Sequence, residues 1–420
     1  MMKEGNNDIE RNLNRVVSKI PNSPSYWNAP RSQLKCLSET HGPATFFITL
    51  SPGEYDWEDM HTYLGKHNKD LLDDGISMNS LSTMDPVLTS VFIHQRFQSI
   101  HRFILESDCL GKVEHWFYRI EYQSRGTPHF HCLYWIKDAP IVGQSSDEAV
   151  MKFISDHITC EFPSISENAE LHNLVSSYQC HKCGNYCLKA KKSKKGTFCK
   201  SCRFGFPRRI TSKLILYDVI ESILGRKSSD FKKRLYDLVR EPKEARVNDY
   251  NKMLIILWRG NMDIQFIGEK SFSLVGYVTK YVTKPDKSHL SNDDFGIDVP
   301  IMTKLYRFVY RCLKGREIGA YEAIDRWLLN SLFECSDVFK FVSTVFPQYR
   351  TQMMKDFSDL EKADQNSTDI FKKDLLSTFY PERPPELENM SLRDYAASYE
   401  RVYRDPKKIL EYINGILSLN

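Results

Sequence analysis

The sequence predicts an α+β fold, and three segments support this prediction. The run from Ala44 to Leu50 is mostly apolar and is followed by Ser-Pro-Gly, as expected for a buried strand that ends in a turn. Residues 85–108 carry apolar positions at the spacing of one long amphipathic helix. Residues 112–123 and 129–136 are two strand-like runs around the turn sequence SRGTP, which together predict a β-hairpin.

The rest of the chain is expected to be more helical. Several prolines interrupt residues 1–40, so we expect a helical or irregular lead-in there. Helices are predicted around 211–240, whereas the run KMLIILW, residues 252–258, is predicted to be a strand. Residues 285–298 are the best candidate for a linker. The expected parts are a lead-in over 1–40, a main domain over 41–285 with an insertion over 178–209, and a mostly helical region over 300–420.

Composition indicates an ordinary globular protein. The chain has 420 residues, of which 41% are hydrophobic and 27% are charged, and this length allows two or three packed units. No stretch approaches the roughly 18 consecutive apolar residues of a membrane span, and the polar N-terminus has no secretory signal. We therefore expect no membrane partner and a cytoplasmic location, or a nuclear one if the host is eukaryotic.

The cysteines are concentrated in one short segment. Five of the eleven fall within 23 residues, at Cys180, Cys183, Cys187, Cys199 and Cys202. In a reducing compartment such a cluster favours metal binding over disulfides. The spacing Cys180-x2-Cys183-x15-Cys199-x2-Cys202 is typical of a four-cysteine zinc site. The other six cysteines are expected to be small core residues.

The same segment is strongly basic. Between Leu171 and Tyr217 there is no acidic residue, while eleven lysines and arginines occur. Such a patch suits a polyanion such as nucleic acid, although a solvated loop or a nuclear-import signal would have the same composition. The candidate DNA-binding residues are Lys191, Lys192, Lys194, Lys195, Arg203, Arg208 and Arg209.

The hairpin contains a candidate cation site. Alternation along a strand places His129 and His131 on one face, about 7 Å apart. Counting back across the turn places Gln123 near His129 and Glu121 near His131. Two imidazoles and an oxygen ligand would suit Mg²⁺ or Mn²⁺ bridged to a phosphate. Glu121 is the better third ligand because it is charged, and Gln123 is the alternative ligand. A structural interpretation is also open, in which the two histidines only form hydrogen bonds and bind no metal.

The pattern E-x-Q-x-R-G-x-P-H-hydrophobic-H is more specific, and it resembles the HUH endonucleases, within them the Helitron-type rolling-circle transposases. The resemblance extends in family order over most of residues 20–345. It includes the segments PSYWNAPRSQLKCLSETHGPATFFITLSPGEYDW, CRFGFPRR, VNDYNKMLIILWRGNMDIQ, YVTKYVTK and KGREIGAYEA. It implies an HUH endonuclease core over 41–285, with a central antiparallel sheet flanked by helices and an inserted zinc module.

The resemblance also implies the nucleophiles. It points to Tyr277 and Tyr281, which lie four residues apart and would project from one face of a helix. Lys280 and Lys284 flank them and could neutralise phosphate or favour the phenolate. The implied reaction is attack of a tyrosine on a phosphate of single-stranded or locally melted DNA, giving a 5′-phosphotyrosine and a free 3′-hydroxyl.

Two further expectations concern DNA and zinc. Exposed aromatic side chains such as Trp116, Tyr118 or Tyr134 could stack on bases, unless they pack in the core. For the zinc module the resemblance implies the ligands His181, Cys183, Cys187 and Cys202, so that Cys180 and Cys199 become alternates and the ligand set stays open.

Full-length relatives in this family usually carry a C-terminal helicase. No G-x-x-x-x-G-K-[ST] motif occurs here, so no P-loop ATPase is expected in this chain. A helicase, if one is needed, would come from another chain, and the sequence would then be a truncated copy, a split gene product, a domesticated remnant or a fragment. The alternatives to an active endonuclease are a catalytically inactive zinc-containing DNA-binding remnant and a rolling-circle replication initiator.

Overall fold

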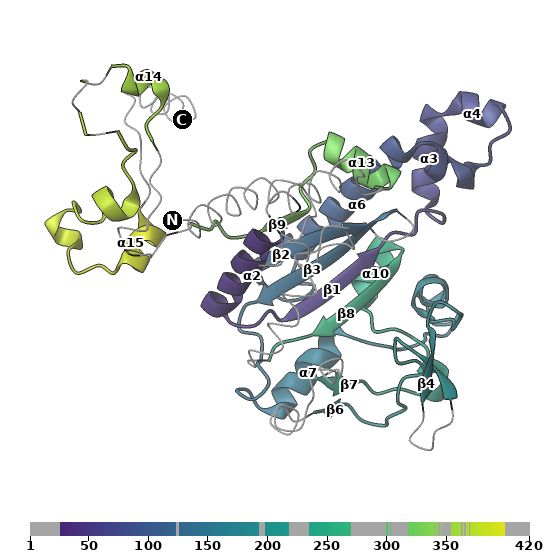
Figure 1. Cartoon of the computed structure of the whole chain (residues 1–420). Coiled ribbons are helices and arrows are strands. Elements are labelled where there is room, and N and C mark those ends of the chain that lie inside the picture. The colour runs from purple at the N-terminus through teal and green to yellow at the C-terminus, as the bar shows by residue number, and fades with distance from the viewer. Residues whose placement is uncertain are drawn as a thin grey trace, which may run out of the picture. The chain divides into compact units, whose positions relative to one another are not determined.

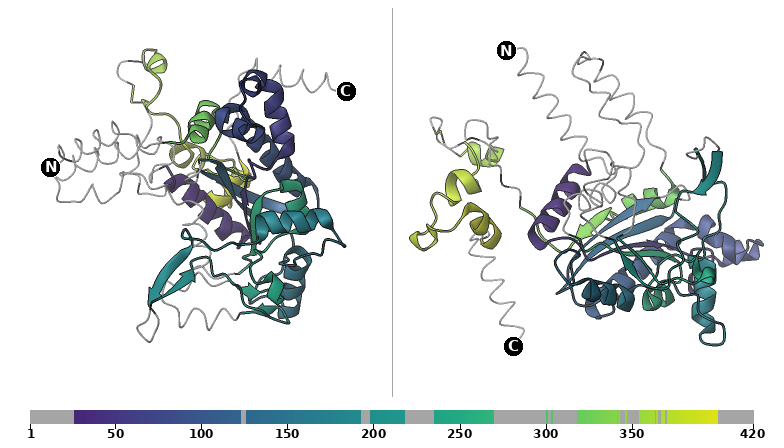
Figure 2. Two further views of the ribbon diagram at one scale, coloured as in Figure 1. Left: turned by 90° about the vertical axis from the view of Figure 1, so that its right-hand side faces the viewer. Right: turned by 90° about the horizontal axis from the view of Figure 1, so that it is seen from below.

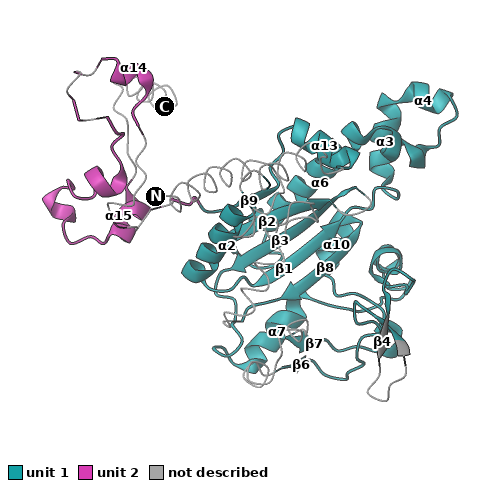
Figure 3. Cartoon of the chain, viewed as in Figure 1, with its two compact units in different colours: residues 1–337 teal, residues 338–420 magenta. Residues whose placement is uncertain are grey.

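The computed structural model divides the chain into two compact units, Met1–Asp337 and Val338–Asn420, which are considered separately (Figure 3). The structure describes residues 26–122, 126–192, 198–217, 235–269, 300, 303, 318–340, 342, 346, 354–362, 364, 367–368 and 370–399, with the side chains of 190–199 excepted. Several predicted features lie outside the described residues: Gln123, Tyr277, Lys280, Tyr281, Lys284 and the linker 285–298.

The first unit is built on a five-stranded antiparallel sheet (Figure 1). The strand order is β8-β1-β3-β2-β9. The strands are β1 Phe46–Ser51, β2 Val113–Tyr122, β3 Pro128–Ile136, β8 Asn261–Phe266 and β9 Phe333–Cys335. The α+β class and the central antiparallel sheet are thereby confirmed, as is the hairpin of β2 and β3.

Helices and two small sheets surround this core. The helices are α2 Asn28–His41, α3 Glu58–His67, α4 Lys69–Asp73, η1 Met78–Ser80, α5 Leu81–Met84, α6 Pro86–Glu106, α7 Asp147–His157, α8 Ala169–Leu174, η2 Val175–Gln179, η4 Pro242–Glu244, α10 Lys252–Trp258 and α13 Ala320–Trp327. The small sheets pair β4 Leu188–Lys192 with β5 Phe198–Cys202, and β6 Ile215–Leu216 with β7 Tyr236–Asp237.

The long helix predicted over 85–108 is α6, and it packs on one face of the sheet. Asp85 caps its N-terminus by accepting a hydrogen bond from the Leu88 N–H, and a proline follows in the first turn, where it is tolerated. Phe97 of α6 stacks on Phe130 of β3, with ring centroids 3.8 Å apart. Side chains alternate along β3, so its odd-numbered residues point to the opposite face of the sheet.

Helix α2 lies on that opposite face, as the two views in Figure 2 show. The guanidinium of Arg119 in β2 lies 4.2 Å from the ring centroid of Trp27, which immediately precedes α2. Trp27, Leu34 and Leu37 are buried, so part of the expected lead-in over 1–40 is a packed helix.

Strand β9 extends the main sheet beyond the expected domain boundary. It pairs with β2, although it lies well beyond residue 285, where the main domain was expected to end.

Two predictions of secondary structure are wrong. Residues 252–258 form helix α10, because Asn251 caps its N-terminus by accepting from the N–H groups of Met253 and Leu254. This cap overrides the strand-like apolar run. Within 211–240, the ends Ile215–Leu216 and Tyr236–Asp237 are paired strands instead of helices, and residues 218–234 between them lie outside the described part.

The described part of the second unit consists of short helices separated by turns. They are α14 Phe357–Leu360, η7 Leu375–Phe379, η8 Pro385–Leu387 and α15 Leu392–Ser398. Asp374 caps η7 and Ser391 caps α15. Among the residues described in either unit, no helix combines the length and apolar composition needed to cross a membrane.

A buried carboxylate attaches α13 to the sheet and to α6. Asp325 of α13 accepts hydrogen bonds from Ser90 (2.5 Å) and His94 (2.8 Å) of α6, and from the hydroxyl of Tyr122 at the end of β2. Burial alone would raise the pKa of Asp325, but the hydrogen bond and charge of His94, with the two hydroxyl donors, outweigh it and leave the pKa lowered. The ionised carboxylate is therefore the form that holds these elements together.

Replacing this carboxylate should destabilise the fold. We expect Asp325→Asn to lower the free energy of unfolding by about 3 kcal/mol, because an amide cannot accept from all these donors. Urea denaturation monitored by circular dichroism measures the change, with the exposed Asp70→Asn as the matched control. Because the pKa of Asp325 is lowered in the folded state, its carboxylate stabilises the fold above about pH 4, and this stabilisation is lost as the pH falls through the folded-state pKa. The difference in unfolding free energy between Asp325→Asn and the wild type should therefore become smaller in acid. Equal unfolding midpoints for the two variants would contradict this role.

Candidate metal and nucleic-acid site

The two histidines of the hairpin lie side by side on the α2 face of the sheet. His129 and His131 have ring centroids 4.7 Å apart, with the ring planes nearly perpendicular. Both side chains are buried, and His131 is only 1% exposed. Strand β3 is buried along its whole length, so the rings are held in a rigid part of the molecule.

Strand β1 orients both rings. The Ser51 hydroxyl lies 2.7 Å from Nδ1 of His129, and the Thr49 hydroxyl lies 3.3 Å from Nδ1 of His131. These contacts follow from the antiparallel register, which pairs Thr49 with His131 and continues toward Ser51 and His129. Neither hydroxyl residue was predicted from the sequence to be part of the site. Their alternation could have indicated it, because Thr49 and Ser51 share one face of the predicted strand.

Glu121 approaches the same pair from the other side. Its Oε2 atom lies 2.8 Å from Nε2 of His131, and its side chain is 33% exposed. The predicted proximity of Glu121 and His131 is therefore observed. The expected register is nevertheless wrong, because β2 and β3 pair Glu121 with His129, and Arg119 with His131. Pro128 belongs to β3 and not to the turn, and this shifts the pairing by two residues, which keeps every side chain on its predicted face.

The charges around Glu121 keep it ionised. Burial by itself would raise its pKa, but the hydrogen bond to His131 and the charges of His131, Arg119 and His129 lower the pKa to about 2. Arg119 is almost fully buried, so its charge acts at low dielectric. The site thus combines two imidazoles with a carboxylate that stays negative, and that carboxylate is its most exposed member.

This arrangement suits a divalent cation. Nδ1 of each ring faces a hydroxyl, so Nε2 is the atom that each histidine could offer to a metal ion; Nε2 of His131 bonds Glu121 in this structure. Imidazole nitrogens and a carboxylate oxygen are accepted ligands for Mn²⁺ and related ions, and Glu121 forms the exposed edge of the group.

The cysteine segment forms a second cluster. Ligand atoms of His181, Cys183, Cys187 and Cys202 all lie within 4.8 Å of one another. Nε2 of His181 is 3.3 Å from Sγ of Cys202 and 3.5 Å from Sγ of Cys187. These are the four residues that the family resemblance implied. Cys180 is not in the cluster, and the side chain of Cys199 lies outside the described residues.

The base of the β4–β5 hairpin brings two of these cysteines together. Cys202 ends β5 and pairs with Leu188 at the start of β4, next to Cys187. Burial would raise the pKa of the Cys202 thiol, but hydrogen bonds from the backbone of Phe204 and Phe206 and from the neighbouring thiols outweigh it, so the pKa is lowered. A thiol that ionises easily is a better metal ligand.

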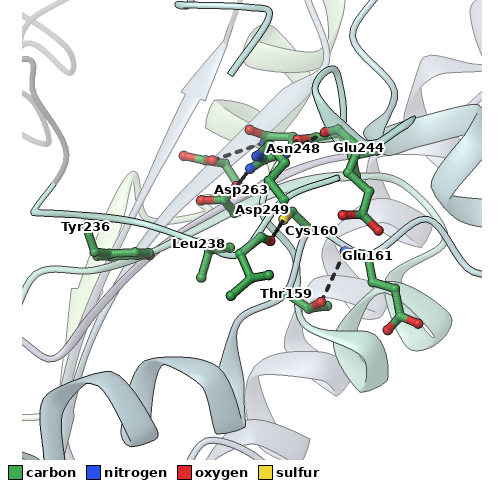
Figure 4. A network of polar contacts seen from close by, with 12 residues as sticks. Thr159, Cys160, Glu161, Tyr236, Leu238, Glu244, Asn248, Asp249 and Asp263 are labelled. Atoms are coloured by element: carbon green, nitrogen blue, oxygen red, sulfur yellow. Dashed lines mark hydrogen bonds and ion pairs between the residues drawn. The ribbon is translucent and has the colours of Figure 1, made fainter. Parts of the chain in front are cut away.

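A buried polar network supports the segment beside this cluster (Figure 4). The Asn248 amide donates to Asp263 of β8 at 3.0 Å, and Asp249 forms an ion pair with Arg240 at 2.8 Å in which both side chains are buried. Through backbone hydrogen bonds the same segment holds the chain before the cysteines: Asn248 N–H donates to Gln179, and His181 N–H donates to Arg246. The cluster is therefore tied to the edge of the main sheet.

Arginines surround the cluster on its described side. Arg208 lies over the ring of Phe206 at 4.4 Å, and that ring stacks on His181. Arg246, which the sequence analysis did not single out because it lies 44 residues beyond Cys202, is exposed and donates to Sγ of Cys183 at 3.4 Å. Arg203 and Arg209 are also exposed. The positive charge predicted here is thus present, although the side chains of Lys191, Lys192, Lys194 and Lys195 lie outside the described residues.

The predicted stacking aromatics are not a DNA platform. Tyr118 and Tyr134 are 2% and 1% exposed, and Trp116 is half-buried against the ring of Tyr118. They form the core between the sheet and α6, where Tyr134 contacts His101 through its hydroxyl. Of the scattered cysteines, Cys132 and Cys160 are buried as expected, but Cys36 is exposed.

Comparison with known proteins concerns the first third of the chain. No curated protein matches it. Residues 2–134 match a family described as "Helitron helicase-like domain at N-terminus". The matched range contains Glu121, His129 and His131 and ends before the cysteine cluster. The predicted resemblance is confirmed for this range: residues 2–134 are similar to the N-terminal region of Helitron-type proteins.

Proposed function

We propose that the protein is a metal-dependent endonuclease and strand transferase that acts on single-stranded DNA in Helitron-type transposition. The observation that carries this proposal is that His129 and His131 lie side by side, with Glu121 bonded to His131, within a region similar to the Helitron N-terminal domain. A carboxylate held ionised beside two oriented imidazoles fits a cation site better than an ordinary structural ion pair, because its outer edge stays exposed.

Each residue of the hairpin site has its own role in this proposal. His129, His131 and Glu121 would hold Mg²⁺ or Mn²⁺, which supplies Lewis-acid polarisation of the scissile phosphate. The hydroxyls of Ser51 and Thr49 would hold the orientation of the rings, as outer partners of metal-binding histidines do. Arg119 keeps Glu121 negative from behind the site.

The nucleophiles of the proposed reaction are Tyr277 and Tyr281. The phenolate oxygen of one tyrosine forms a bond to phosphorus, the bond from phosphorus to the 3′-oxygen breaks, and that oxygen takes up a proton to become a hydroxyl. The product is a 5′-phosphotyrosine, and the bond energy is retained, so the step can run backwards to join strands. Lys280 and Lys284 would stabilise the phenolate or the phosphate charge.

We further propose that His181, Cys183, Cys187 and Cys202 bind a structural Zn²⁺. The donor set of three thiolates and one imidazole is one that zinc prefers, and the mutual distances allow a single ion. The ion would fix the base of the basic β4–β5 hairpin, so that its lysines and Arg203, Arg208 and Arg209 meet the DNA backbone.

Covalent adduct formation tests the nuclease directly. Incubation with single-stranded oligonucleotides and Mn²⁺ should give an SDS-stable protein–DNA band, because the phosphotyrosine bond survives denaturation. The double variant Tyr277→Phe/Tyr281→Phe should give none, whereas the exposed Tyr399→Phe should behave like the wild type. If the folded wild-type protein forms no adduct, the proposed nuclease activity is wrong. If the double variant still forms an adduct, the assignment of Tyr277 and Tyr281 as nucleophiles is wrong.

The hydroxyl of Ser51 should matter through the metal. We expect Ser51→Ala to raise the Mn²⁺ concentration for half-maximal cleavage about 10-fold or more, with cleavage recovered at high Mn²⁺, because the cost falls on ligand orientation. Metal titrations of the cleavage rate measure this, with Ser99→Ala on α6 as the control and His131→Ala as the variant that no metal concentration rescues. An unchanged Mn²⁺ dependence in Ser51→Ala would show that β1 does not position the ring.

Substitutions of two cysteines, Cys180 and Cys187, distinguish between the candidate sets of zinc ligands. Cys187→Ser should bind one zinc fewer per chain, while Cys180→Ser should bind as much as the wild type, because only Cys187 lies in the observed cluster. Zinc per chain, measured by atomic emission after dialysis against a weak chelator, decides between them. The reverse result would favour the four-cysteine set that includes Cys180 and Cys199.

A further inference from the structure

We propose that His41, His115 and Asp337 form an additional site for a divalent transition-metal ion such as Zn²⁺, at the far end of the main sheet. Their ligand atoms all lie within 4.8 Å of one another. His41 is the last residue of α2, His115 belongs to β2, and Asp337 follows β9. Neither the nuclease chemistry nor the cysteine cluster uses these residues.

This cluster cannot share an ion with the hairpin histidines. His115 lies opposite Trp135 in the β2–β3 pairing, whereas Glu121 lies opposite His129. The six-residue separation along β2 corresponds to about 20 Å. The two sites therefore lie at opposite ends of one strand and would take their metals independently.

The geometry directs both rings at one carboxylate. Nδ1 of His115 is 3.0 Å from Oδ2 of Asp337, and Nε2 of His41 is 3.6 Å from Oδ1. The two imidazoles stack, with centroids 3.5 Å apart and planes at 21°. Each carboxylate oxygen thus faces a different ring nitrogen, and the three ligand atoms lie close enough together to share one ion.

The donor set suits a divalent ion. Both imidazoles can bind such an ion in their neutral form, while the Asp337 carboxylate balances part of its charge. Two imidazoles and a carboxylate form a mixed N/O set that suits Zn²⁺ and leaves a fourth position for water.

The three ligands are held by the surrounding fold. Ser336 donates its hydroxyl to Oδ2 of Asp337 at 2.8 Å, and its N–H donates to the Trp116 carbonyl at 2.9 Å, which continues the β2–β9 pairing as far as Asp337. Beyond His41, Gly42 has a positive φ of 81°, and its carbonyl accepts from the Trp135 indole at 2.9 Å. The ligand side chains are 23–29% exposed, so an ion can reach them.

The consequence is a metal-dependent attachment of the sheet edge. Strand β9 has only three residues, and a strand this short holds its place with few ladder hydrogen bonds. An ion shared by α2, β2 and Asp337 would fasten it at the point where the chain leaves the first unit. Zinc binding here should therefore raise the thermal stability of the full chain.

Zinc counting on the full-length protein tests the proposal. After equilibrium dialysis at a fixed free Zn²⁺ concentration, His115→Ala and Asp337→Asn should each bind about one zinc fewer per chain than the wild type. His41→Ala serves as the second histidine variant, since its exposed side chain can be removed without opening the core. His67→Ala, another exposed histidine at the end of a helix, is the matched control and should bind as much as the wild type.

Cobalt distinguishes this site from the cysteine cluster. Co²⁺ bound by thiolates gives an intense ultraviolet charge-transfer band, whereas a site of imidazoles and a carboxylate gives only weak visible bands. His41→Ala and Asp337→Asn should keep the thiolate band and lose part of the zinc-induced rise in Tm. Full zinc occupancy in these variants, or an equal loss in His67→Ala, would overturn the proposal.

Discussion

The position of β3 at the centre of the sheet is the constraint on which the candidate site depends. One face of this strand must fill the core with Phe130 against Phe97, and alternation then sends His129 and His131 to the other face. A slip by one residue would exchange the two faces and bury the imidazoles under α6, at a large cost in free energy. Register is thus specified by the side that packs on α6, while the two imidazoles lie on the other side. A slip by two residues, as between the expected and observed pairing, preserves this division, so Glu121 reaches His131 in either register.

The cysteine cluster depends on a different kind of support. It has little apolar core of its own, and its residues are held by the base of the β4–β5 hairpin and by the segment that contains Arg240, Asn248 and Asp249. A buried ion pair such as Arg240–Asp249 is expensive to desolvate, but it specifies one geometry once it forms. A metal ion would add the missing cohesion. Arg203 and Arg209 remain exposed beside the module.

Much of the fold was predictable because local pattern and tertiary packing agree there. The strand of β1, the long helix α6 and the β2–β3 hairpin all have a period that matches their environment. The prediction for residues 252–258 was wrong because a short apolar segment fits a strand or a buried helix equally well. The N-terminal cap at Asn251 favours the helix. The site was predictable as far as residues near in sequence define it. Ser51, Arg119 and Arg246 were missed because only strand pairing and loop packing bring them to the histidines and thiols.

The two proposed metal sites lie at opposite ends of β2, where different segments meet the strand. Along β2 the end near Glu121 meets the hairpin turn and α13, whereas the end near His115 meets α2 and β9. At each end a histidine faces a carboxylate supplied by another segment. The difference lies in exposure: His131 is almost fully buried behind Glu121, which directs approach from a single side, whereas His41, His115 and Asp337 are all partly exposed. A site that must present an ion to a substrate needs the first arrangement, and a site that only fastens two segments is served by the second.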